Sequence, residues 1–298
     1  MLQRILRPQG ALRAISSLAK KPSSAGLPRF QTRGLHRVPQ LRHGEHFRQH
    51  GVPDLLSPEG FDFAWTQYQT LMVDKLNLLT QDTIDADATP GELLIKYSKR
   101  PEMASLFNYA SMAHNNHFFF NCLSRSSVRI PDEFVKEIEE SCSSVESLKQ
   151  DFLAAANAMF GPGFVWLAKN LDRQGLLQIV CTYNAGSPYP AAHSRRQPVD
   201  MNTHNPDAPV SYQYAGAMGS HSPHTRDLAP GAIDIQPILC VNTWQHVWLM
   251  DYGIAGKEEY LERWWDRIDW EHVYENFKEA PAAKMARSPP MRQSLSML

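Results

Sequence analysis

Length, composition and cysteine spacing limit the classes of protein that this chain can represent. The 298 residues, 43% of them apolar and 20% charged, suffice for one large globular domain or two ordinary ones. No apolar run reaches the roughly eighteen residues that a membrane-spanning helix needs, and the four cysteines include no CxxC pair. The sequence therefore argues against a membrane span, a disulfide scaffold and a zinc ribbon, and it suits a reducing compartment.

Charge is distributed unevenly along the chain, although the net charge is only −1. Nine Lys and Arg residues precede the first acidic residue, Glu45. Residues 1–33 combine Arg with Leu, Ile, Ala and Ser, which is typical of a mitochondrial presequence, and a basic arm that binds RNA or an acidic protein is the alternative. Without this segment, 23 Lys and Arg oppose 31 Asp and Glu, a net charge of about −8, so we expect no primary nucleic-acid clamp.

Helical periodicity marks the part of the chain that follows an entry arm. Residues 34–58 are rich in Pro, His and Gly and are predicted to form that arm in an extended conformation. Apolar side chains then recur at three- and four-residue steps over residues 61–79 and again over residues 103–123. We expect these two stretches to form a helical hairpin domain over residues 59–130.

Strand-like apolar runs mark the second half of the chain. Residues 176–183 and 237–244 are apolar and bounded by turn residues, so they are predicted to be buried strands that carry Cys181 and Cys240 as inert buried thiols. The polar segment 187–236 between them lacks periodicity and is interpreted as an inserted loop. Its four histidines could suggest zinc, but without cysteines or a defined scaffold a solvated loop is the preferred interpretation (His193, His204, His221 and His224).

Five segments in the same order resemble motifs of the iron/manganese superoxide dismutase family. They are VDKLN at 73–77, NNHFFFN at 115–121, FGPGFVWL at 160–167, TYNAGSP at 182–188 and the block that begins NTWQHVWL at 242–273. The resemblance implies an α+β fold, with the N-terminal helical hairpin followed by a C-terminal domain over residues 131–277. In that domain helices flank a small antiparallel sheet, and residues 278–298 follow it as a flexible tail.

The family's metal ligands, three His and one Asp, are only half retained. By position, the first ligand falls on Ala64, the second on His117, the Asp on Asn242 and the last His on His246. Alanine cannot ligate, and the amide of Asn242 replaces the anionic ligand. We therefore expect no metal and no other cofactor, and we interpret His117 and His246 as buried, hydrogen-bonded imidazoles rather than as a surviving metal site.

Neighbouring positions of the resemblance are altered as well. Where the family has a Tyr and a Gln that bond the metal-bound solvent, this chain has Met72 and Ala185. The family's Glu, which reaches across a dimer to the opposite ligand His, is Gln245 here, so the hydrogen-bonding capacity is kept and the charge is lost. We expect Gln245 and His246 to lie at a dimer interface.

The lost ligands and the presequence-like segment together predict a structural role. The chain resembles the catalytically inactive dismutase-like proteins of the fungal mitochondrial ribosomal small subunit, which implies the mitochondrial matrix, ribosomal protein partners and support of translation. A dimer with a second dismutase-like subunit is expected, and rRNA could be contacted through the basic arm or tail. The alternatives are a mitochondrial superoxide dismutase with an atypical metal centre, and a matrix binding module unrelated to ribosomes.

Overall fold

Helices dominate the N-terminal part of the structure. A computed structural model of the chain describes residues 36–98, 100–171, 175–189 and 234–281. The helices of this part are α1 (Gly44–His50), α2 (Pro58–Phe61), η1 (Asp62–Gln67), α3 (Tyr68–Thr80), α4 (Pro90–Tyr97), η2 (Pro101–Met103) and α5 (Ala104–Asn121). The first of the two long helices contains a π-helical turn, η1, between α2 and α3. Such turns shift the side chains that follow them and often mark functional positions.

A three-stranded antiparallel sheet organises the C-terminal part. Its elements are α6 (Asp132–Cys142), α7 (Val145–Ala158), β1 (Gly163–Asn170), β2 (Leu177–Tyr183), β3 (Ile235–Asn242), α10 (Gln245–Tyr252), α11 (Lys257–Trp265) and α12 (Trp270–Glu279). The strand order is β2-β1-β3, with Gly163 opposite Tyr183 and Phe164 opposite Asn242. The predicted α+β fold is confirmed.

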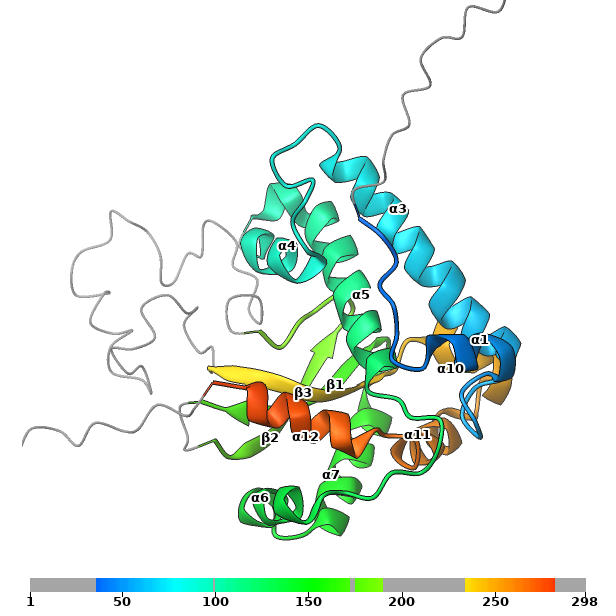
Figure 1. Cartoon of the computed structure of the whole chain (residues 1–298), viewed down its shortest axis with the longest axis vertical. Helices are drawn as coiled ribbons and strands as arrows, with labels where there is room; N and C mark the ends of the chain where they lie inside the picture. Colours follow the sequence, from blue (N-terminus) through cyan, green and yellow to red (C-terminus); the bar gives the residue numbers. More distant parts are fainter. Residues whose placement is uncertain (1–35, 99, 172–174, 190–233, 282–298) are drawn as a thin grey trace, which may run out of the picture. The chain divides into compact units, whose positions relative to one another are not determined.

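Helix α5 connects the helical part to the sheet. It contacts α3, α4 and β3, and it crosses the centre of the picture in Figure 1, between α4 and α3. On the central strand β1, Trp166 is fully buried, and its indole donates a hydrogen bond to Thr182 of β2. Beyond the sheet, the rings of Phe152 and Trp264 stack at 5.3 Å between α7 and α11. One continuous core therefore supports both parts of the fold.

The prediction that residues 34–58 form an extended arm is wrong in part, because this segment contains the helix α1. The side chain of Phe47 is fully buried and its ring packs edge-on against Phe61 at 5.6 Å. A helix of seven residues is not stable by itself, so this tertiary contact, rather than local composition, stabilises it.

The second strand is also less buried than the sequence predicted. Strands β2 and β3 are both outer strands of the sheet, but the Cys181 side chain on β2 is exposed, whereas Cys240 on β3, which packs against α5 and α12, is buried as expected. An apolar run indicates a strand but does not tell whether both of its faces are covered. Strand β3 begins at Ile235, so residues 235 and 236 belong to the sheet and not to the inserted loop, whose residues 190–233 lie outside the described part of the chain.

Candidate functional site

Four elements that are far apart in the sequence meet around Asn116. Ala64 lies on η1, and its carbonyl accepts a hydrogen bond from Asn116 Nδ2 at 3.3 Å. Asn242, the last residue of β3, donates from Nδ2 to Asn116 Oδ1 at 3.2 Å. His117 follows Asn116 on α5, and His246 lies on α10 shortly after β3 ends. Asn116 thus links the elements that carry the predicted ligand positions.

A chain of three buried amides occupies the centre of this region. Beyond the Asn242 contact, Asn116 Nδ2 also donates to Gln69 Oε1 at 3.1 Å, and Gln69 Nε2 donates to the carbonyl of Ala113 at 2.8 Å. Asn242 Oδ1 accepts a hydrogen bond from the Trp244 backbone at 2.9 Å. All three amide side chains are buried, and each is hydrogen-bonded, which is how buried polar groups avoid a desolvation penalty.

Asn116 and Gln69 are the functional residues that the sequence did not single out. Asn116 lies inside the motif NNHFFFN, but nothing in that motif indicates that the second Asn bonds two other elements. Gln69 follows the π-helical turn, which changes the direction in which the side chains of this helix point. Because a π-helical turn has no clear sequence signal, the helical spacing alone could not place Gln69 beside Asn116.

The two retained histidines lie against aromatic rings. His117 lies 5.9 Å from Trp65 between ring centroids, and His246 stacks on Tyr68 at 4.0 Å. Burial lowers the pKa of His117, and it lowers the pKa of His246 to about 4, so both rings are neutral at neutral pH. The Nε2 atoms of both rings are buried without a hydrogen-bond partner among the described residues. His117 also makes a hydrogen bond with the Gln40 backbone, so the expectation of a hydrogen-bonded imidazole holds for His117, although neither Nε2 atom has a partner among the described residues.

The side chains in this region do not fit iron or manganese. Ala64 has no donor atom, and the Asn242 amide already bonds through both its nitrogen and its oxygen. Because both Nε2 atoms are buried, two neutral imidazoles without a carboxylate would leave the charge of a divalent cation here unbalanced and without water to complete its coordination. In the part of the chain that the structure describes, no three His, Cys, Asp or Glu side chains gather into a possible metal site.

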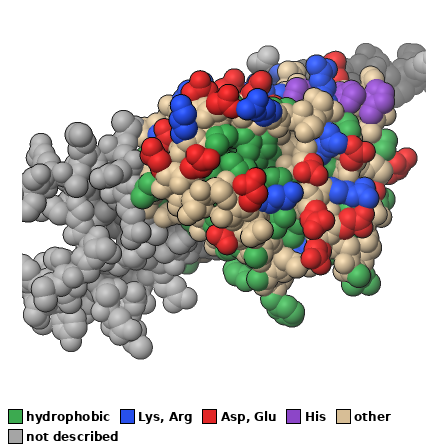
Figure 2. Space-filling model, turned by 90° about the horizontal axis from the view of Figure 1, so that it is seen from below, with side chains coloured by type: hydrophobic (Ala, Val, Ile, Leu, Met, Phe, Trp, Pro, Cys, Tyr) green, Lys and Arg blue, Asp and Glu red, His purple; other side chains and the backbone are tan. Residues whose placement is uncertain are grey.

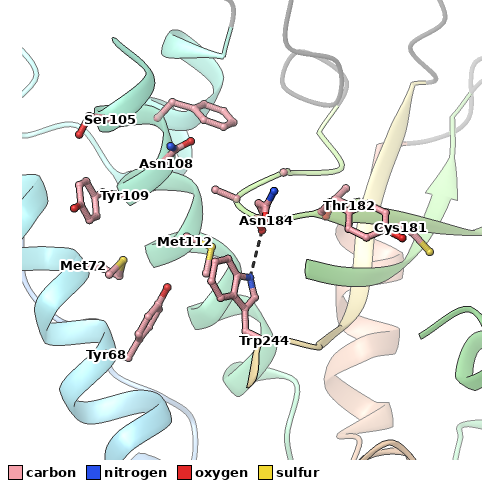
Figure 3. Close-up of a pocket in the computed structure, with 14 residues that line it drawn as sticks. Tyr68, Met72, Ser105, Asn108, Tyr109, Met112, Cys181, Thr182, Asn184 and Trp244 are labelled. Carbon is pink, nitrogen blue, oxygen red and sulfur yellow. Dashed lines mark hydrogen bonds between the residues drawn. The ribbon is translucent and has the colours of Figure 1, made fainter. Parts of the chain in front are cut away.

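A pocket of about 1040 Å³ opens beside the amide chain, between the helical part and the sheet. Figure 3 shows Tyr68 and Met72 of α3 on one side, Tyr109 and Met112 of α5 next to them, and Asn184 opposite, where it is hydrogen-bonded to Trp244. Ala185 also lines it, so the two predicted outer positions, Met72 and Ala185, border the same space. Among the described residues that line it, none carries a charge at neutral pH.

Gln245 begins α10 at the surface, next to the half-buried Trp244 and His246. Large apolar side chains are exposed nearby in sequence: Met250 is 60% exposed and Ile254 is 91% exposed. Phe160, on the loop before β1, is 97% exposed. Lys257 at the start of α11 donates to the Met159 carbonyl at 2.9 Å, so the loops that carry Ile254 and Phe160 lie close together.

Comparisons with known proteins agree with this geometry. A family model of the C-terminal domain of iron/manganese superoxide dismutases matches residues 131–203 and 218–276. The small ribosomal subunit protein mS43 of Schizosaccharomyces pombe is 29% identical over 292 residues, which cover 92% of this chain and 97% of that protein. The protein mS42 of the same yeast is 30% identical over 195 residues, covering 63% and 74% of the two chains.

Metal-binding relatives match over a similar part of the chain. The iron superoxide dismutase of Helicobacter pylori is 27% identical over 234 residues, which cover 78% of this chain and 87% of that protein. The resemblance that the five sequence motifs predicted is therefore confirmed.

Replacing Asn242 tests the amide chain directly. In Asn242→Asp an ionised carboxylate would face Asn116 Oδ1 without a proton to donate, so we expect the free energy of unfolding to fall by about 3 kcal/mol. Because Ala64 still provides no ligand, the variant should bind no stoichiometric manganese or iron. Urea unfolding and metal analysis measure both effects, with Asn157→Asp on the exposed face of α7 as the matched control. An Asn242→Asp variant that is as stable as the control would contradict the role of this chain.

Acid should destabilise the protein through His114 on α5. Burial lowers the pKa of this ring to about 4, and its Nε2 lies 2.8 Å from the Tyr189 hydroxyl. Because the unfolded chain takes up the proton first, the stability contributed by the neutral ring is complete above about pH 6.5 and is lost as pH falls towards 4. The ring keeps some exposure, so we expect a loss of about 2 kcal/mol that is absent in His114→Gln. Urea unfolding at pH 7 and pH 4 gives the comparison, and equal losses in both proteins would refute it.

Proposed function

The chain belongs to the iron/manganese superoxide dismutase family, and on this basis we propose that it is a structural protein of the mitochondrial small ribosomal subunit that supports mitochondrial translation. The observation that carries the proposal is the buried amide chain of Asn242, Asn116 and Gln69, which stands where the resemblance implies a metal centre. The likeness to mS43 over 92% of the chain adds the ribosomal assignment. The protein is therefore a mitochondrial, ribosomal member of the family and not an enzyme.

The alternative function is a superoxide dismutase with an atypical centre. It requires a redox-active metal, and the two neutral imidazoles of His117 and His246 would have to hold that metal with neither a carboxylate nor a third imidazole. In the described part of the chain, the side chains that line the pocket beside them include no charged group that could attract an anionic substrate. We therefore keep the structural role.

In this proposal the main partners are other proteins of the mitochondrial small ribosomal subunit. On the face drawn in Figure 2, acidic and basic side chains are interspersed and no broad basic area is seen. In the arm, Arg42 already pairs with Glu275 at 2.7 Å, which leaves it less available to phosphate. Contact with rRNA is accordingly peripheral, through the basic segment 1–33 or the tail after residue 277. From the proposed ribosomal role we also infer a location in the mitochondrial matrix.

The second proposed contact is a dimer with another dismutase-like subunit. Gln245 is exposed and can bond an opposing imidazole. Phe160, Met250 and Ile254 add exposed apolar side chains on α10 and on two loops that lie close to each other. Exposed apolar side chains of this size, bordered by polar ones, are typical of protein interfaces. A ribosome offers a single asymmetric position, so the partner is a related subunit rather than a second copy.

Fractionation of mitochondria tests the ribosomal role. We expect the untagged chain to sediment with the small ribosomal subunit in a sucrose gradient, and the purified protein to hold well under one equivalent of manganese or iron without superoxide turnover. A chain that stays at the top of the gradient would support a free matrix module. Stoichiometric metal with turnover would instead support the dismutase.

Cross-linking tests the dimer. A photoreactive residue at position 245 should capture a dismutase-like subunit in intact ribosomes, and Phe160→Ala should lower the yield because it removes apolar contact area. The same probe at Ile95, which is 44% exposed on α4, is the matched control and should not capture that subunit. Capture of rRNA or an unrelated protein from position 245 would overturn the proposed pairing.

A further inference from the structure

We propose that His46 and His50 on α1 form a binding site for a divalent late transition-metal ion, with Zn²⁺ as the ion to test first. The site is separate from the amide chain, because α1 belongs to the entry arm and lies at the outer edge of the molecule in Figure 1. Histidine side chains also gather at one edge of the surface in Figure 2. The inference does not depend on the ribosomal role.

The spacing and the ring geometry carry the proposal. His46 and His50 are four residues apart, so their side chains leave the same face of α1 one turn apart. Their rings stack, with centroids 4.7 Å apart and an inclination of 23°, so both lie on the same face, and rotation of one ring about its side-chain bonds would turn the two free nitrogens towards one ion. Two histidines at this spacing on one helix face can hold one zinc ion between them.

A backbone hydrogen bond prepares His50 to donate a lone pair. Its Nδ1 lies 3.3 Å from the His46 carbonyl oxygen. A carbonyl can only accept, so Nδ1 carries the proton and Nε2 is left with a free lone pair. Metal-binding histidines commonly donate their other N–H to a backbone carbonyl in this way, which fixes the ring and raises its basicity.

His43, the next histidine towards the N-terminus, contacts a different segment and therefore provides a control. His43, at the N-terminal end of α1, has its Nε2 3.6 Å from Asp269 Oδ2 on another segment. His46 is half-buried and His50 is exposed, so water can complete the coordination of a bound ion. Imidazole nitrogens favour zinc and copper over calcium and magnesium, which prefer oxygen ligands.

A bound ion would strengthen the arm. With seven residues, α1 depends on its packing through Phe47, and a metal that bridges one turn would hold the helical conformation of residues 46–50 directly. The backbone N–H of Gly51, which bonds the Phe47 carbonyl at 2.9 Å, should then exchange more slowly.

Calorimetry and hydrogen exchange of the untagged full chain test the site. In a titration with Zn²⁺ we expect His46→Ala and His50→Ala each to remove one equivalent of binding or weaken it about tenfold or more. The variant His43→Ala should bind Zn²⁺ like the native chain, and a titration of the native chain with Mg²⁺ should show no binding at this site. Zinc should slow exchange in the peptide 44–51 of the native chain but not of either variant.

Neither His46→Ala nor His50→Ala should disturb folding, so a loss of zinc binding can be assigned to the missing imidazole. Both replaced side chains lie away from the buried face of α1, which is formed by Gly44 and Phe47, so the metal-free variants should unfold like the native chain. Any zinc bound by the other histidines of the chain remains in every variant and cancels in the comparison. Unchanged zinc binding in His50→Ala, or an equal loss in His43→Ala, would overturn the proposal.

Discussion

The hydrogen bonds of Asn116 couple the two halves of this molecule. One side chain on α5 bonds the helix that carries Ala64 and the strand that ends at Asn242. The amide of Gln69 then returns the connection to α5 through the Ala113 carbonyl. Each of these groups is shielded from water, so breaking one bond leaves a buried polar atom unpaired, and the elements must keep their mutual positions.

The same chain shows how neutral side chains can satisfy one another in the region where the resemblance implies a metal centre. A cation and its carboxylate ligand bring charges into the interior, and these charges must balance each other to be tolerated. An Asn in place of the Asp removes the anion, and its amide both donates and accepts, so it bonds Asn116 and the Trp244 backbone at once. Neutral amides therefore occupy this region in the described structure, and each is hydrogen-bonded.

Sequence reasoning identified the fold through its motifs and missed features that depend on tertiary contacts. The helical periodicity and the apolar runs predicted helices and strands because their burial patterns are local. Helix α1 was missed because the packing of Phe47 against Phe61 stabilises it. The exposure of Cys181 was missed because it depends on which helices cover the two outer strands. At the site, the motifs singled out Ala64 and Asn242, which both bond Asn116, but the partners of Asn116 could not be predicted from spacing.

The strand order also determines how much free energy a long insertion between β2 and β3 costs. Strands β2 and β3 each pair with β1 and not with each other, so the connection between Tyr183 and Ile235 joins two outer strands. It leaves the sheet at the Gly163 end of β1 and returns at the Asn170 end, a span of roughly 25 Å that about eight extended residues could cover. Loop-closure entropy grows only logarithmically, by about 0.6 kcal/mol for each doubling of length. The junction can therefore accumulate sequence at a cost of about 2 kcal/mol without breaking a ladder hydrogen bond, which makes it a place where this family can acquire new binding segments.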